Sequence, residues 1–144
     1  MYYQKVSALL HAIITMWGKD DEIFDMVGDS LKAFGRYVMS VYEMETRITM
    51  LRFRCNDTAE FQAEVTNLDR NRKLAHDAAI ACCTSLNRIA KRLGVEAVCP
   101  DTEDRYVIAD FCADITMEFF HRGQENHRPI SDQEVQEFLD KAAE

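Results

Sequence analysis

The chain has 144 residues, 47% of them hydrophobic, which is enough for one domain whose core needs no disulfide or metal to hold it together. Two prolines and five glycines favour long helices over a turn-rich sheet protein. A formal net charge of −8 argues against a nucleic-acid partner, and no apolar run is long enough to predict a membrane span.

The first two predicted helices are joined at a glycine. Apolar residues at alternating steps of three and four predict a helix from Tyr2 to Trp17, ended by Gly18. The same rhythm predicts a second, unusually long helix from Asp21 to Arg54. Gly28 and Gly35 fall on one side of it, at a cost of about 1 kcal/mol each relative to alanine. They predict either the close approach of another helix or a kink.

The third predicted helix carries the most regular pattern in the chain. Asn56 to Thr58 forms a turn that also caps this helix, which runs to Leu93 and ends at Gly94. Its apolar positions alternate steps of four and three throughout, the rhythm of helices packed side by side. They are Phe61, Val65, Leu68, position 72, Ala75, Ala79, Cys82, Leu86, Ile89 and Leu93.

Two further helices complete the predicted fold. Asp101 is the expected cap of a helix from Thr102 to Arg122, which is apolar almost all round and is therefore expected to be central. After a polar loop from Gln124 to Pro129, the segment Ser131 to Glu134 matches a capping box and begins a short last helix. We therefore predict an all-α antiparallel bundle of about five helices, one domain over 1–144, built on a long central hairpin of the second and third helices.

One polar cluster stands out inside that hairpin. Arg72 occupies the centre of the third helix's apolar stripe, and Glu45 occupies a matching place on the second helix. An antiparallel hairpin brings them within about 7.5 Å along the axis, so we expect the two to meet. Asp69 and His76 share the face of Arg72 and extend the cluster. The cluster is either a structural ion pair that fixes helix register, or a pocket for a small polar or anionic ligand.

A second candidate site follows the fourth predicted helix. Asp110, Asp114, Glu118 and His121 are spaced four, four and three residues apart and so lie on one line. Bundles that hold two metal ions use two ExxH helices, whereas this chain has one such motif, at Glu118 to His121. The stripe is either a solvated face or a metal site, and we expect no cofactor.

A segment of the third helix resembles a small bacterial all-helical family of unknown function. The resemblance rests on Asp69-Arg70-Asn71-Arg72-Lys73-Leu74-Ala75-His76-Asp77-Ala78, followed by Leu86-Asn87-Arg88. It implies a compact helical protein and implies no reaction.

The number and spacing of the cysteines predict the cellular compartment of the protein. Their number is odd, at five, and no two form a CxxC, a usage typical of a reducing compartment such as the cytoplasm. Catalytic motifs such as a nucleophile elbow or a phosphate-binding glycine loop are missing from the sequence. We therefore expect a non-catalytic cytoplasmic protein that acts through protein contacts, as a homodimer. The alternatives are a ligand binder or enzyme that uses Glu45, Asp69, Arg72 and His76, and a metal-binding bundle.

Overall fold

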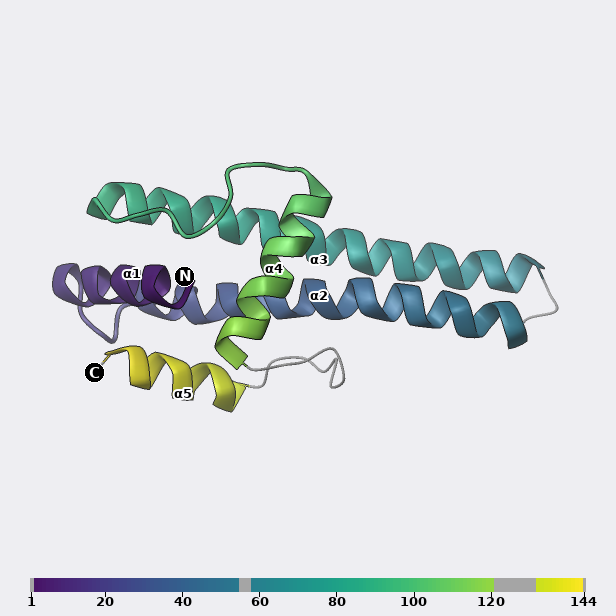
Figure 1. Cartoon of the computed structure of the whole chain (residues 1–144), viewed down its shortest axis with the longest axis horizontal. Helices are drawn as coiled ribbons and strands as arrows, with labels where there is room; N and C mark the ends of the chain where they lie inside the picture. The colour runs from purple at the N-terminus through teal and green to yellow at the C-terminus, as the bar shows by residue number, and fades with distance from the viewer. Residues whose placement is uncertain (1, 55–57, 121–131, 144) are drawn as a thin grey trace.

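The structure, a computed structural model, describes residues 2–54, 58–120 and 132–143. Those residues form α-helices and no strand, in the order α1 (Tyr2–Met16), α2 (Glu22–Arg54), α3 (Thr58–Leu93), α4 (Arg105–Phe120) and α5 (Asp132–Ala143) (Figure 1). The predicted all-α fold and its long hairpin, α2 and α3, are confirmed. Within the described ranges, no helix is both long and apolar enough to cross a bilayer.

The helix ends follow local chemistry. Gly18 and Gly94 have φ angles of 103° and 71°, the left-handed conformation that ends α1 and α3 and that glycine adopts without strain. At the start of α2, the Asp21 carboxylate accepts a hydrogen bond from the Ile23 amide at 2.8 Å. These residues explain why the bounds of the first three helices could be predicted closely.

The start of α4 differs from the prediction. The helix begins at Arg105 instead of Thr102, and its cap is Asp104 instead of Asp101. The Asp104 carboxylate accepts hydrogen bonds from the amides of Tyr106 and Val107, at 2.9 and 3.2 Å. Two acidic residues three apart are both plausible caps by sequence, and the backbone path decides between them. The predicted end of this helix, the 124–129 loop and the Ser131 cap lie outside the described residues.

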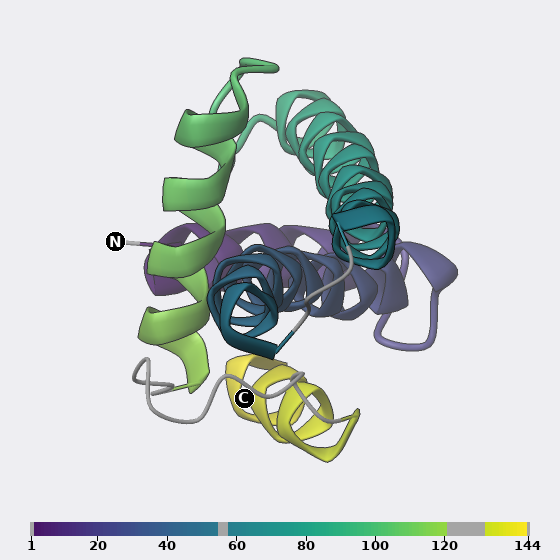
Figure 2. The same ribbon diagram turned by 90° about the vertical axis from the view of Figure 1, so that its right-hand side faces the viewer.

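The hydrophobic core lies at one end of the hairpin. Viewed along the hairpin, α2 lies between α3, α4 and α5 (Figure 2). Seven of the largest side chains in this core are almost wholly buried: Leu9, Leu10, Ile13, Phe34, Tyr37, Ile108 and Ile115. At about 1.5–3 kcal/mol for each large apolar side chain removed from water, this end of the molecule holds most of the folding free energy. We call it the body.

Helix α4 is buried on one side only, which corrects the expectation that a helix apolar almost all round is central. Ile108, Phe111 and Ile115 face the core, whereas Tyr106 and Met117 are exposed. The helix lies across the outside of the α2–α3 hairpin (Figure 1), so only one side of it can be covered.

Gly28 is the contact point between α2 and α5. A Cβ atom there would lie 2.9 Å from Val135 Cγ1 and 3.0 Å from Leu139 Cδ1, closer than such atoms normally approach. The prediction that a glycine in α2 allows another helix to approach closely is therefore confirmed at Gly28, and that helix is α5.

Beyond the body, the hairpin continues as a projecting pair of helices, which we call the arm: residues 38–54 of α2 and 58–78 of α3 (Figure 1). The last buried residue of α2 is Tyr37 and the first of α3 is Ala79. No described residue of the arm is fully buried. One apolar seam joins its helices, and the members of that seam are all partly exposed. They are Val41, Met44, Ile48, Leu51, Phe61, Val65, Leu68 and Ala75.

Candidate functional site

A cavity of about 450 Å³ lies where the arm joins the body, between α2, α3 and α4. We call it the arm-base cavity. Its walls combine charged, aromatic and aliphatic side chains: Tyr37, Val41, Met44, Glu45, Ile48, Asp69, Arg72, Arg105, Tyr106, Ala109 and Asp110. Three of the four residues predicted as a ligand site, Glu45, Asp69 and Arg72, therefore line one cavity.

Arg72 is the most enclosed charge of this cavity. Its position in the heptad stripe of α3 turns it toward α2, and only 12% of its side chain is exposed. Its Nε and Nη2 both donate to Asp69 Oδ1, at 3.1 and 3.0 Å. Burial raises the pKa of the Tyr37 hydroxyl, and the charge and hydrogen bonding of the adjacent Arg72 oppose that rise. The guanidinium thus lies between a carboxylate and a phenol.

Glu45 does not form the ion pair that the helix register predicted. Its side chain is exposed at the edge of the cavity, and no ion pair joins it to Arg72 in the described part of the chain. Asp69 lies one turn before Arg72 on the same helix and reaches the guanidinium without bridging the offset between α2 and α3. The buried charge is paired as expected, but the partner is local.

His76, the fourth predicted residue, lies one turn beyond Arg72 but is not part of the cavity wall. Its ring packs edge-on against Tyr37, with centroids 5.4 Å apart. Nδ1 lies 3.2 Å from Asp77 Oδ1, while the buried Nε2 has no hydrogen-bond partner among the described residues. His76 therefore contacts the site through Tyr37, which sequence reasoning had not singled out. The sequence pattern gave no signal for Tyr37, because its contact with the site follows from its burial inside the hairpin.

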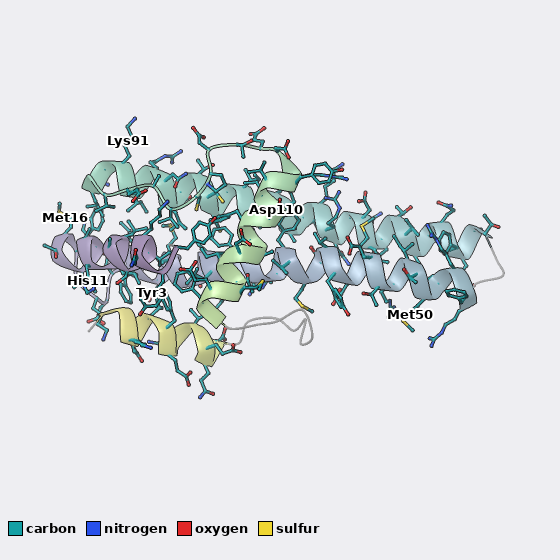
Figure 3. The ribbon with its side chains drawn as sticks, viewed as in Figure 1. Tyr3, His11, Met16, Met50, Lys91 and Asp110 are labelled. Carbon is teal, nitrogen blue, oxygen red and sulfur yellow. The ribbon has the colours of Figure 1, made fainter. Side chains whose placement is uncertain are left out.

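The acidic residues predicted to lie on one line of α4 do not form one site in the structure. The Glu118 carboxylate accepts hydrogen bonds from the amides of Tyr3 and Tyr2, at 2.8 and 3.3 Å, and so caps α1. Burial raises the pKa of the Glu118 carboxyl, but these hydrogen bonds outweigh it and bring the pKa below its ordinary value. Asp110 faces the arm-base cavity (labelled in Figure 3), and His121 lies outside the described residues. Within the described ranges, no cluster of three or more His, Cys, Asp or Glu side chains is arranged to hold a metal.

Asn87 has a role that the sequence pattern did not reveal. Its Nδ2 donates to the Cys99 carbonyl at 2.8 Å, and its Oδ1 accepts from the Cys99 amide at 3.0 Å. The side chain thus fastens the connection between α3 and α4, and this connection sets where α4 begins. In the sequence, Asn87 stood out only as part of the Leu86-Asn87-Arg88 segment. The structure shows that its side chain holds the backbone of the connection.

The described cysteines are all free thiols. Cys112 and Cys83 are buried and Cys82 is partly buried. Burial raises the pKa of Cys112 and of Cys82, so both stay protonated at neutral pH. These thiols act as small apolar side chains of the body.

Compared with known proteins, the chain matches over residues 3–125 a family described as a protein of unknown function (DUF3232). The match extends from α1 to α4, and so includes the arm, the arm-base cavity and the body apart from α5. No curated protein and no solved structure matches the chain.

Proposed function

The chain belongs to this family of unknown function, and we propose that it acts without catalysis, by binding a second copy of itself through the arm. The observation that carries the proposal is the complete lack of buried residues along the described arm, in contrast to the body. We place the protein in a bacterial cytoplasm, on the support of its free thiols and of the resemblance carried by residues 69–88.

The arm lacks the packing that normally stabilises helices. Isolated helices are marginal in water, and most of their stability in proteins comes from burying an apolar face. Here one seam serves two helices, and Met50, Phe53 and Leu74 remain 42%, 87% and 64% exposed outside it. Met50 is labelled near the end of the arm in Figure 3. A second hairpin packed on this one would complete a four-helix bundle and cover such side chains.

Charge along the arm selects the orientation of the second copy. On α2, Glu43 lies nearer the body and Arg47 nearer the end of the arm, and their spacing of four residues places them on one face of the helix. If two arms lie antiparallel with α2 on α2, each Glu43 carboxylate faces the Arg47 guanidinium of the other copy. Neither side chain forms an ion pair within the described part of the chain.

The Glu43–Arg47 pair sets the height of the two-fold axis. Its midpoint is position 45. Positions 45 and 67 are each eleven residues from the middle of the connection between α2 and α3, so they lie level in the hairpin. One two-fold operation at this height forms both copies of the pair, as a closed dimer requires.

The area available predicts a dimer of modest affinity. The arm is about 30 Å long and about 20 Å wide, from the rise and diameter of two helices. One face thus offers about 600 Å² per copy, or about 1,200 Å² in total, which is the lower limit for a specific interface. We expect a dissociation constant in the micromolar range.

Sedimentation velocity over a range of concentrations tests the proposal. We expect a monomer–dimer equilibrium that Arg47→Glu weakens about tenfold, because two symmetry-related pairs become repulsive. Glu43→Arg should weaken it similarly, while Lys91→Glu, an exposed charge on the body, serves as the control with unchanged association.

Mixing the two arm variants is the decisive step. Arg47→Glu and Glu43→Arg should form a heterodimer in which one of the two symmetry-related pairs becomes favourable again with reversed charges. Effects confined to one helix cannot be rescued in this way. A wild-type chain that stays monomeric at several hundred micromolar would refute dimerisation, and absence of rescue would refute the antiparallel arrangement.

A further inference from the structure

The Arg72 guanidinium has hydrogen-bonding capacity that the described residues do not use. Arginine carries five N–H donors, and two hydrogen bonds go to the same Asp69 oxygen, while the Tyr37 hydroxyl donates to the Arg105 carbonyl at 3.4 Å. The remaining N–H groups have no partner among the described residues. These N–H groups are not sealed inside the protein: they open onto the arm-base cavity beside them, where water or a ligand can accept hydrogen bonds from them.

The other charges of the cavity limit which ligand fits. Asp69 is already bound to Arg72, which leaves Glu45 and Asp110 as carboxylates without an ion-pair partner in the described chain. Arg105 is stacked on the Tyr106 ring at 4.9 Å and lies at the exposed edge. Two such carboxylates repel a multiply charged anion such as phosphate, yet they attract an amine. The wall thus presents an anion-binding group and a cation-binding group together.

The size and remaining surface of the cavity fit a small organic molecule. Its volume of about 450 Å³ falls within the range of about 300–1,000 Å³ that is usual for ligand sites. Val41, Met44 and Ile48 supply an apolar wall along α2. A short aliphatic or aromatic group could pack there between the two charged groups.

From this arrangement we propose that the arm-base cavity binds a small zwitterion of the amino-acid class. Its carboxylate accepts hydrogen bonds from Arg72, its ammonium group faces Glu45 and Asp110, and its side chain packs on the apolar wall of α2. The site is independent of the proposed dimer, because each cavity is built from α2, α3 and α4 of one copy.

Thermal melts of the full-length protein test the proposal with defined probes: the standard L-amino acids, acetate, butylamine and inorganic phosphate. At least one amino acid should raise the melting temperature by several degrees at about 100 times its Kd. Acetate and butylamine should each bind at least about tenfold more weakly, because each satisfies one charged group. Phosphate should give no shift.

Calorimetric titrations of variants locate the site. Glu45→Gln leaves an exposed position uncharged, so the fold is preserved, and it should weaken the amino acid about tenfold. Arg72→Gln should abolish binding. Glu43→Gln is the matched control: it removes an exposed carboxylate of the same helix outside the cavity, and it should leave ligand affinity unchanged. Because Glu43 belongs to the proposed dimer face, this variant also separates the two proposals.

Three results would overturn the inference. A panel in which no amino acid shifts the melt would mean that water alone fills the cavity. Equal binding of acetate and amino acids would show that the amine is not recognised. An undiminished affinity in Glu45→Gln would place the ligand elsewhere.

Discussion

Replacing Asn87 by alanine tests how α4 is positioned. The Asn87 amide makes two hydrogen bonds to the backbone of the buried residue Cys99, at 2.8 and 3.0 Å. Each is worth about 0.5–1.5 kcal/mol net, and more if the backbone group is left without a partner. Alanine returns about 0.5 kcal/mol of helix propensity. We therefore expect Asn87→Ala to lower the free energy of unfolding by about 1–3 kcal/mol.

The same helix provides a matched control. Asn71 is exposed on α3, so Asn71→Ala changes the same atoms without breaking these contacts and should be neutral or slightly stabilising. Urea denaturation gives both free energies. Hydrogen exchange should in addition show lost protection from about residue 95 to 104 in Asn87→Ala alone. If both variants unfold at the same urea concentration, Asn87 does not fasten the connection and our reasoning about the start of α4 is wrong.

Three further predictions concern packing, the polar cluster and the thiols. Gly28→Leu should destabilise the protein by about 1–3 kcal/mol or more in urea denaturation, since Val135 and Leu139 leave no room for a side chain. A double-mutant cycle on Arg72 and Asp69 should give a coupling of up to about 1 kcal/mol, because Asp69 is half exposed, whereas the Arg72–Glu45 cycle should give nearly zero. At neutral pH Cys82 and Cys112 of the native protein should react slowly with iodoacetamide, because burial raises the pKa of both thiols, and all five cysteines should react after unfolding without reductant.

The helices could be predicted from sequence because their signals are local. Apolar spacing fixes where a helix runs, and a glycine such as Gly18 or Gly94 fixes where it ends. The start of α4 could not be fixed, because Asp101 and Asp104 are equivalent caps until Asn87 fastens the preceding connection.

The arm could not be predicted because its heptad stripe is the same inside and outside the body. Leu86 and Val65 belong to one repeat on α3, yet Leu86 is buried and Val65 is partly exposed. Burial depends on whether α1, α4 and α5 cover the other side of the hairpin, and helix periodicity carries no information on that. The predicted partner of Arg72 was wrong for a related reason. Sequence spacing and helix register place both Glu45 and Asp69 within reach of the Arg72 guanidinium, and side-chain geometry decides between them.

Photo-crosslinking from Met50 shows whether two arms pack antiparallel. Met50 lies near the end of the arm and is 42% exposed. With p-benzoylphenylalanine at position 50, irradiation of mixed ¹⁴N- and ¹⁵N-labelled chains should yield isotopically mixed adducts of twice the 16.6 kDa monomer mass. Because the proposed axis lies level with Glu45, the attached peptide should come from the partner around residues 36–44 of α2. Adducts between the two positions 50 would indicate a parallel pair, and the absence of any intermolecular adduct would indicate that the arms do not meet. Either result would contradict the antiparallel dimer.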